Sequence, residues 1–248
     1  YCGRGRGESH GKPPPGRLAA YSPRCRRQWG MVQGTLFEAD PAKPMPFAGW
    51  VVWYRGWLPA SKASALANAL RAEVPWSVHR IRMFGRWVDS PRLSCWMGEP
   101  GASYRYSGAV FEPEPWHPAI EALRPRLEAA CGARFNSVLL NRYRDGRDAM
   151  GWHSDDEPEL GPAPVIASLS LGAPRRFLMR LKADHATKVE WRLGHGDLLL
   201  MRGECQRLAQ HALPRMAGLG EERINLTFRW IRPAPSPAPR PAVRPPVR

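Results

Sequence analysis

The second half of the chain is a succession of short strand-like segments, and this succession limits the fold more than any other feature. Six segments rich in β-branched, aromatic and other apolar residues are separated by turn residues, at 136–144, 164–171, 175–182, 188–193, 197–202 and 223–231. Helical segments do not alternate with them, so the spacing predicts a sandwich or jelly roll rather than a βαβ fold. Residues 203–222 are predicted to form a long loop.

One strand and two helices are predicted before this region. The strand covers residues 50–57, and residues 61–74 have apolar side chains at helical spacing, with Ser61 as the N-cap. The second helix covers 118–131 and contains Pro125, which should kink or shorten it. Both helices are most simply packing layers on a sheet, so the fold class is mainly β with flanking helices.

A histidine and a carboxylate stand two residues apart, at His153 and Asp155. In an extended segment, residues i and i+2 point to the same side, so both groups can bind one ion from one face. A third ligand must come from further along the chain, and His211 is the best candidate. Two histidines and one carboxylate on one face of an octahedron leave three positions open, which is the arrangement of non-heme Fe(II) oxygenases.

The last predicted strand alternates between polar and apolar residues. Arg223, Asn225 and Arg229 share one face, and a sheet with one face in water would show the same alternation. Two arginines with an amide between them would equally suit a dicarboxylate, because each guanidinium can hold a carboxylate through two parallel hydrogen bonds. Asn141 and Tyr143 repeat the i, i+2 spacing upstream and place an amide and a phenol on one face.

Taken together, these segments resemble the AlkB family of Fe(II)- and 2-oxoglutarate-dependent dioxygenases. The resemblance covers roughly residues 50 to 231 and lies in Asn141-Arg-Tyr-Arg-Asp-Gly, His153-Ser-Asp-Asp-Glu, Ile166-Ala-Ser-Leu-Ser-Leu-Gly, Gly196-Asp-Leu-Leu-Leu-Met, His211-Ala-Leu-Pro and Arg223-Ile-Asn-Leu-Thr-Phe-Arg. It implies a double-stranded β-helix, or jelly roll, with Fe(II) bound by His153, Asp155 and His211. It also implies that 2-oxoglutarate is held at its two carboxylates by Arg223 and Arg229, helped by Asn141, Tyr143 and Asn225, and that O2 is the oxidant.

Residues 81–108 interleave basic and aromatic side chains. This mixture suits phosphate contacts combined with base stacking, which is worth about 1–3 kcal/mol per base, although core packing would explain any single aromatic residue. The segment resembles the nucleotide-recognition lid of AlkB-type DNA repair enzymes. The resemblance implies that Phe84 fills the gap left by an extruded base, and that Tyr106 stacks on that base opposite His153.

Four further residues receive roles from the same resemblance. It places Arg92, Tyr104 and Glu157 near the edge of the base, and Asp156 in the substrate region, where it would orient neighbours of the metal. The lid would be part of a dioxygenase domain at 50–232, preceded by an extension at 31–49.

The net charge is +15, and its distribution bears on the partner. Residues 1–30 carry +6 and residues 233–248 carry +3, so +6 remains in the part predicted to fold. This surplus favours a polyanion such as nucleic acid, although a surface that only confers solubility would look the same. Both terminal segments are rich in arginine and proline without hydrophobic periodicity and are predicted to be disordered.

Several further properties follow from composition and short motifs. Five irregularly spaced cysteines suit a reduced cytoplasmic protein better than a disulfide framework, and without a run of eighteen apolar residues no membrane span is expected. The segment Gln33-Gly-Thr-Leu-Phe37 resembles the peptide by which bacterial DNA enzymes bind the sliding clamp, a weak contact that chance would also explain. The chain is expected to be a monomer.

The resemblance implies oxidative demethylation of N-alkylated bases in DNA, such as 1-methyladenine and 3-methylcytosine, with release of formaldehyde and succinate. A base inside a duplex is out of reach of a buried iron, so the enzyme should flip the base or act on single strands. The same chemistry on RNA or protein remains an alternative. A nucleic-acid-binding protein with a purely structural metal is a second alternative, but it would leave the two arginines without a dicarboxylate ligand.

Overall fold

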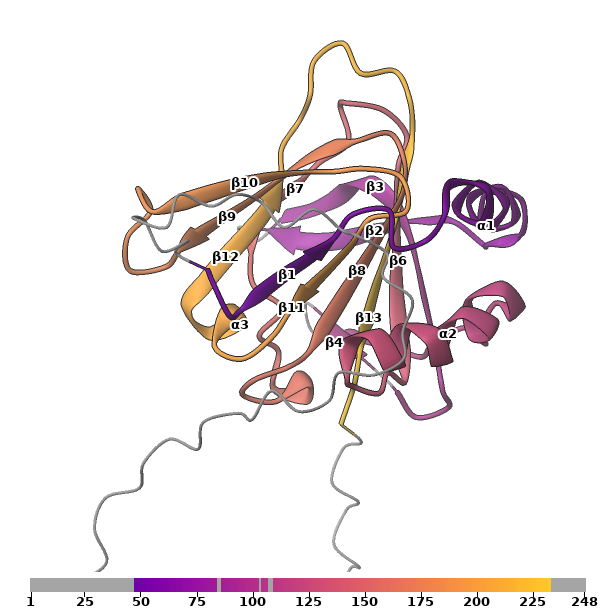
Figure 1. Cartoon of the computed structure of the whole chain (residues 1–248), viewed down its shortest axis with the longest axis horizontal. Coiled ribbons are helices and arrows are strands. Elements are labelled where there is room, and N and C mark those ends of the chain that lie inside the picture. Colours follow the sequence, from indigo (N-terminus) through magenta and orange to yellow (C-terminus); the bar gives the residue numbers. More distant parts are fainter. Residues whose placement is uncertain (1–46, 84–85, 103, 107–108, 233–248) are drawn as a thin grey trace, which may run out of the picture. The chain divides into compact units, whose positions relative to one another are not determined.

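The computed structural model describes residues 47–83, 86–102, 104–106 and 109–232 (Figure 1). The side chains of 79–88 and 103–111 lie outside this description, and all described residues belong to one compact unit, Leu36–Arg248. The predicted tails at 1–30 and 233–248 and the clamp-like segment at 33–37 also lie outside the described residues. The proposed domain boundaries and the clamp contact therefore stay predictions.

Two antiparallel sheets form the body of the fold. The larger contains β1 (Val51–Tyr54), β2 (Ser77–Met83), β3 (Arg86–Gly98), β6 (Ser137–Tyr143), β8 (Ile166–Gly172), β11 (Leu198–Met201) and β13 (Arg223–Arg229). The smaller contains β7 (Met150–His153), β9 (Arg175–Leu181), β10 (Lys188–Leu193) and β12 (Ala209–Leu213). The strand orders are β1-β11-β8-β13-β6-β3-β2 and β10-β9-β12-β7, so consecutive strands often lie in different sheets. This arrangement confirms the predicted jelly roll.

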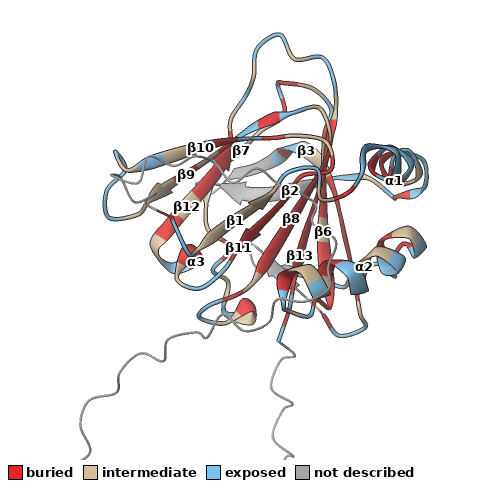
Figure 2. Cartoon of the chain, in the orientation of Figure 1, coloured by how far each residue is buried: buried red, intermediate tan, exposed pale blue. Residues whose placement is uncertain are grey.

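Strand β13 lies in the middle of the larger sheet and is buried on both faces (Figure 2). Its apolar residues Ile224, Leu226 and Phe228 belong to the main core, together with residues of both long helices. Its polar residues face the other way and are also buried, so the alternation does not mark a face in water. The polar face instead lines the space between the two sheets.

The two long helices, α1 (Ala60–Glu73) and α2 (Pro118–Cys131), contribute to the core on the outer face of the larger sheet. The predicted N-cap Ser61 is wrong, because α1 begins at Ala60, so that Ser61 is its second residue and Pro59 is its N-cap. Pro125 does not shorten α2. Its side chain lies on the exposed face, where water can satisfy the carbonyl that loses its helical partner. Among the described residues, no helix is long and apolar enough to cross a membrane.

The predicted loop at 203–222 contains regular structure, which corrects that prediction. It includes α3 (Cys205–Leu208) and strand β12. β12 has no β-branched residue, but β9 and β7 pair with it on both sides and satisfy its backbone groups. The predicted lid at 81–108 contains the end of β2, all of β3 and β4 (Tyr104–Tyr106). β5 (Ala109–Phe111), which pairs with β4, follows the lid directly, and a 3-10 turn η1 (Pro158–Leu160) lies elsewhere, just after the His153 motif.

Candidate functional site

The three predicted metal ligands lie together on the smaller sheet. β12 and β7 pair in a register that places His211 opposite His153, with the two rings 4.2 Å apart between centroids. Asp155 follows β7, and its Oδ2 lies 3.9 Å from His211 Nε2. The three side chains offer ligand atoms that all lie within 4.8 Å of one another. They could therefore hold one metal ion.

Neighbouring groups orient these ligands. The Nδ1 atom of His153 lies 2.8 Å from the carbonyl of Gly151, which requires a proton on Nδ1 and leaves the Nε2 lone pair free for a metal. The backbone N–H of Asp155 donates to Gln206 Oε1 at 2.9 Å. Phe177 stacks on the His211 ring at 5.3 Å between centroids. Each of the three metal ligands is therefore contacted by a neighbouring group that restrains its position.

Burial and charge give the ligands the protonation states that a metal needs. Burial, with a smaller contribution from the neighbouring His153, lowers the pKa of His211 to about 3, so its imidazole is neutral. Burial alone would raise the pKa of Asp155, but the positive neighbour Arg229 and the two histidines hold it below its usual range. Two neutral imidazoles and an ionised carboxylate are the donor set of non-heme Fe(II) sites.

Arg223 lies on β13 as a buried cation, with 2% of its surface exposed. Its Nη2 donates to Ser170 Oγ at 2.8 Å and to Asn225 Oδ1 at 2.7 Å, while its Nε has no hydrogen-bond partner among the described residues. Burial lowers its pKa to about 10, which still leaves it charged near neutral pH. Within the described part of the chain no carboxylate forms an ion pair with it, so a carboxylate of a ligand would fit there.

Arg229, at the other end of β13, is placed differently. Its Nη2 donates to Asp155 Oδ1 at 2.7 Å, and both side chains are buried. One predicted cosubstrate arginine thus contacts a predicted metal ligand directly. Its contact with 2-oxoglutarate stays a prediction.

A pocket between the sheets collects these groups. Its empty volume is about 480 Å³, which includes its opening to solvent. The eight residues predicted to bind iron or 2-oxoglutarate all line it, namely His153, Asp155, His211, Asn141, Tyr143, Arg223, Asn225 and Arg229. The sheet pairing explains this, because β13 pairs with β6 so that Asn225 lies opposite Asn141 and Arg223 lies opposite Tyr143.

The predicted substrate residues are less closely grouped. Arg92 Nε donates to Asn141 Oδ1 at 2.6 Å, which places Arg92 beside the pocket. Asp156 forms an ion pair with Lys182 at 2.9 Å and does not line the pocket, while Glu157 is half-buried. The side chains of Phe84, Tyr104 and Tyr106 lie outside the described residues. The roles of all six in substrate binding stay predictions.

Sequence reasoning missed two kinds of residue at this site. Ser168 and Ser170 lie on β8, where Ser168 Oγ donates to Asn225 Oδ1 at 2.9 Å and Ser170 accepts from Arg223. The alternation of Ile166-Ala-Ser-Leu-Ser-Leu-Gly could have placed both hydroxyls on one face. Gln206, which binds the backbone of Asp155, lies in a segment predicted to be a loop and carried no signal.

Comparison with known proteins identifies the class. The family model of the 2OG-Fe(II) oxygenase superfamily matches residues 50–229. Human alpha-ketoglutarate-dependent dioxygenase alkB homolog 3 is 40% identical over 194 residues, covering 75% of this chain and 67% of that protein. Mouse DNA oxidative demethylase ALKBH2 is 37% identical over 183 residues, covering 70% of this chain and 77% of that protein. A solved structure of OsALKBH1 shares the fold, with a TM-score of 0.51 at 16% identity over 73% of this chain and 96% of that chain.

The chain therefore belongs to the 2OG-Fe(II) oxygenase superfamily. Within that superfamily it belongs to the AlkB family of dioxygenases, as its sequence motifs predicted. Its cofactor and cosubstrates are Fe(II), 2-oxoglutarate and O2, which fit the histidines, the carboxylate and the buried Arg223 described above.

Proposed function

We propose that this protein removes N-alkyl groups from bases in DNA by oxidation, with 1-methyladenine and 3-methylcytosine as the leading substrates. The observation that carries the proposal is the single pocket in which a His-Asp-His group lies beside a buried arginine that has no carboxylate partner among the described residues. The relatives named as DNA oxidative demethylases support the choice of DNA.

In this proposal His153, Asp155 and His211 hold the iron, and the two sheets hold the cosubstrate between them. The bound iron and 2-oxoglutarate supply, with O2, the oxidation that hydroxylates the alkyl carbon next to nitrogen. Arg223 binds a cosubstrate carboxylate through its fork, and Asn225 keeps that fork oriented by accepting from Arg223 Nη2. The C–N bond of the hydroxylated N-methyl group then breaks, which frees formaldehyde and the unmodified base, and the cosubstrate leaves as succinate and carbon dioxide.

The Arg229–Asp155 pair has a role of its own in the proposed reaction. Asp155 must stay ionised to bind a divalent metal, and the adjacent guanidinium favours that state in a buried setting. Arg229 also restrains one carboxylate oxygen by a hydrogen bond at 2.7 Å. The second oxygen, Oδ2, is the one that lies 3.9 Å from His211. We therefore assign Oδ2 to the metal.

The substrate must bring its alkylated base to a pocket that lies between two sheets, so the base leaves its stack or comes from a single strand. Arg92 is the predicted substrate residue placed beside the pocket, through Asn141. The cationic ring of 1-methyladenine or 3-methylcytosine would favour nearby carboxylates, and Glu157 is the half-buried candidate. Phe84, Tyr104 and Tyr106 complete the proposed contacts from the lid.

Lesion-dependent formaldehyde release tests the function. The full chain is supplied with Fe(II), 2-oxoglutarate and matched methylated or unmethylated oligonucleotides of DNA and RNA. We expect formaldehyde and succinate in equal amounts from methylated DNA, and neither product from the His153→Ala variant. Turnover restricted to RNA would replace DNA by RNA in the proposal. Absence of lesion-dependent turnover on both would reject it. A cytoplasmic location and a monomeric state also remain proposals.

A further inference from the structure

Two loops connect the larger sheet to the smaller sheet at one end of the pocket. Residues 144–149 connect β6 of the larger sheet to β7 of the smaller, and residues 214–222 connect β12 of the smaller sheet to β13 of the larger. These four strands, with the segment directly after β7, carry all eight residues proposed to bind iron or 2-oxoglutarate. The two loops therefore influence how far the metal ligands stand from the cosubstrate residues.

The two loops are bonded to each other. The backbone N–H of Gly146 donates to the carbonyl of Leu219 at 2.8 Å, and the N–H of Met216 donates to the carbonyl of Gly146 at 2.9 Å. A Cβ atom built on Gly146 would lie 1.8 Å from the carbonyl oxygen of Met216. Glycine is thus required by this close approach of two backbones.

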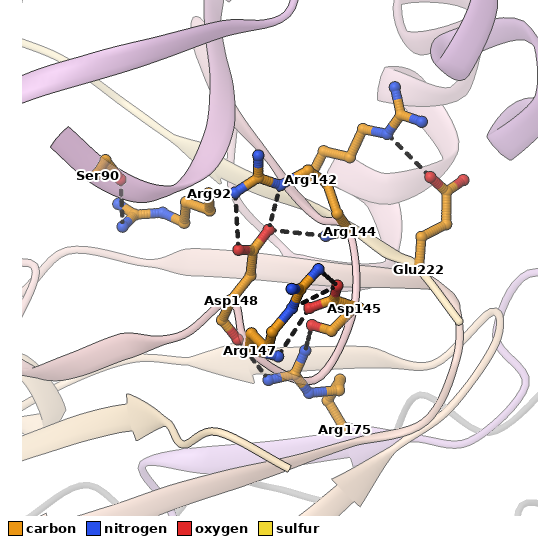
Figure 3. Close-up of polar contacts among 9 residues, drawn as sticks. All are labelled: Ser90, Arg92, Arg142, Arg144, Asp145, Arg147, Asp148, Arg175 and Glu222. Carbon is orange, nitrogen blue, oxygen red and sulfur yellow. Dashed lines mark hydrogen bonds and ion pairs between the residues drawn. The ribbon is translucent and has the colours of Figure 1, made fainter. Parts of the chain in front are cut away.

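Arg175, the first residue of β9, forms hydrogen bonds with both loops, and Figure 3 shows those with the first loop. Its Nη1 donates to the carbonyl of Asp145 at 3.0 Å, and its Nη2 donates to the carbonyls of Asp148 at 2.8 Å and Pro214 at 2.9 Å. The side chain is fully buried, with 0% of its surface exposed. A single guanidinium therefore joins the loop that leads to His153 with the loop that leaves the strand of His211.

The first loop is itself held by two ion pairs (Figure 3). Arg144 binds the carboxylate of Asp148 through Nε at 2.8 Å and Nη2 at 2.9 Å, and its backbone N–H binds the same carboxylate. Arg147 binds Asp145 at 2.6 Å. These contacts favour the loop conformation in which the carbonyls of Asp145 and Asp148 meet Arg175.

Arg175 also lies next to a cosubstrate residue. Its guanidinium carbon is 5.5 Å from the centre of the Tyr143 ring, and the guanidinium carbon of Arg223 lies at the same distance from that ring. A displacement of Arg175 would therefore change the packing around Tyr143 and Arg223. Among the described residues, Arg175 has no carboxylate in an ion pair and its Nε has no hydrogen-bond partner.

Removing a guanidinium from water costs free energy, and hydrogen bonds to neutral carbonyls offset this cost less well than a carboxylate would. Burial lowers the pKa of Arg175, which shows that its charged form is disfavoured there. Apolar residues of similar volume often replace buried ionic groups without loss of stability. What an apolar residue lacks is a rigid fork that binds three carbonyls of two loops at once.

We propose that Arg175 is a positioning residue that fixes the separation of the two sheets at the pocket and so preorganises the binding of 2-oxoglutarate. This inference rests on the cosubstrate site proposed above. Preorganised geometry is sensitive, because a displacement of about 1 Å can cost roughly 100-fold in rate. Without Arg175 the loops can separate, and Tyr143 and Arg223 shift relative to the metal ligands.

The first test is Arg175→Lys in the full chain, loaded with Mn(II) as a redox-stable probe and titrated with 2-oxoglutarate by calorimetry. Lysine keeps the charge but presents a point donor in place of the fork. We expect the Kd for 2-oxoglutarate to rise about 10- to 100-fold, the usual range for loss of a supporting contact around a metal site. The Kd for a methylated single-stranded oligonucleotide, measured without 2-oxoglutarate, should stay within about twofold. A general loss of structure would move both constants.

The matched control is Arg176→Lys, one residue further along β9. Arg176 is exposed and pairs with Glu190 at the surface. The Kd of the Arg176→Lys variant for 2-oxoglutarate should therefore match that of the wild type. A folded Arg175→Lys variant with wild-type affinity for 2-oxoglutarate overturns the inference. A wild-type protein that fails to bind 2-oxoglutarate overturns instead the cosubstrate site on which the proposed function depends.

A second variant separates the loops without touching Arg175. Gly146→Ala introduces the Cβ that meets Met216, and Gly220→Ala in the partner loop is its control, because a Cβ there has no heavy atom within 4 Å. We expect Gly146→Ala to weaken 2-oxoglutarate binding selectively, as Arg175→Lys does, and Gly220→Ala to have no effect. If neither Arg175→Lys nor Gly146→Ala folds, the contact is needed for folding itself and the positioning role is rejected.

Discussion

The two halves of the pocket differ in how their charges are balanced. In the metal half, the Asp155 carboxylate already has Arg229 at 2.7 Å, and burial keeps His211 neutral. In the cosubstrate half, Arg223 is buried against Ser170 and Asn225, without a carboxylate partner in the described part of the chain. The protein therefore balances the charge of the metal half itself, whereas a ligand completes the cosubstrate half.

Both arginines lie on the same face of the same strand, so the difference between them comes from their partners. Arg229 contacts a carboxylate of the protein itself, and Arg223 contacts neutral groups. Two arginines at equivalent positions of one alternating pattern are therefore expected to affect stability differently. Removing charge from the metal half should destabilise the protein, and removing charge from the cosubstrate half should not.

The largest effect is expected from Asp155→Ala. The change removes a proposed metal ligand and takes away the carboxylate that pairs with Arg229. Breaking a buried ion pair costs about 3–5 kcal/mol, so the free energy of unfolding measured by urea denaturation should fall by that amount. Formaldehyde release should disappear. The control is His153→Ala, which should also abolish turnover but destabilise less, because His153 is half-exposed and is not an ion-pair partner of Arg229. Equal stability losses in the two variants would contradict the comparison.

Arg223→Met should have the opposite signature. Loss of the buried cation should leave the metal-free protein as stable as the wild type or more stable, because no carboxylate of the described residues loses an ion pair. The affinity for 2-oxoglutarate should fall about 10- to 100-fold, equivalent to a charged hydrogen bond of about 1.5–3 kcal/mol. Urea denaturation and calorimetry with Mn(II)-loaded protein measure the two quantities. Arg229→Met is the matched control and should lose stability. A strongly destabilised Arg223→Met would show that Arg223 is balanced within the protein.

Acid should lower the free energy of unfolding of the metal-free protein through the residues of the metal half. The pKa of His211 is lowered to about 3 in the folded state, from an ordinary value of 6.5, so the unfolded chain binds the proton more readily between these values. Stability should therefore fall as the pH is lowered from about 6.5 towards 3. The lowered pKa of Asp155 acts in the same direction at the acid end of this range. Urea denaturation in the presence of a chelator measures the slope, and His211→Asn should flatten it. An unchanged slope in that variant would show that groups other than His211 cause the pH dependence of stability.

Much of the site could be predicted from local spacing. His153 and Asp155 are two residues apart in an extended segment, and Arg223 and Arg229 alternate with core residues, so short-range periodicity was enough to place each group on one face. The joining of the two groups in one pocket depends on which strands pair. That information came from the resemblance to a family, because periodicity does not specify long-range register.

The parts that were missed depend on tertiary contacts. β12 has alanine, glutamine and leucine around His211, a composition that does not favour a strand, and its neighbours β7 and β9 make it one. Arg175 looks like a surface residue beside Arg176, and its buried position is visible only once both loops are in place. The error at Ser61 is smaller, since the ends of helices shift easily by one or two residues and the N-cap is Pro59.

The smallest effect is expected from Ser168→Ala, in the cosubstrate half. Ser168 Oγ donates to Asn225 Oδ1 at 2.9 Å. Asn225 Oδ1 also accepts from Arg223, so it keeps a hydrogen-bond partner in the variant. The loss should be about 1 kcal/mol in the free energy of unfolding, the typical worth of one neutral hydrogen bond. The affinity for 2-oxoglutarate should change only a few-fold, because Asn225 still orients the fork of Arg223. Denaturation and calorimetry on the same samples measure both. A loss of affinity as large as that of Arg223→Met would mean that the hydroxyl itself contacts the cosubstrate, and the cosubstrate half would then extend from β13 to β8.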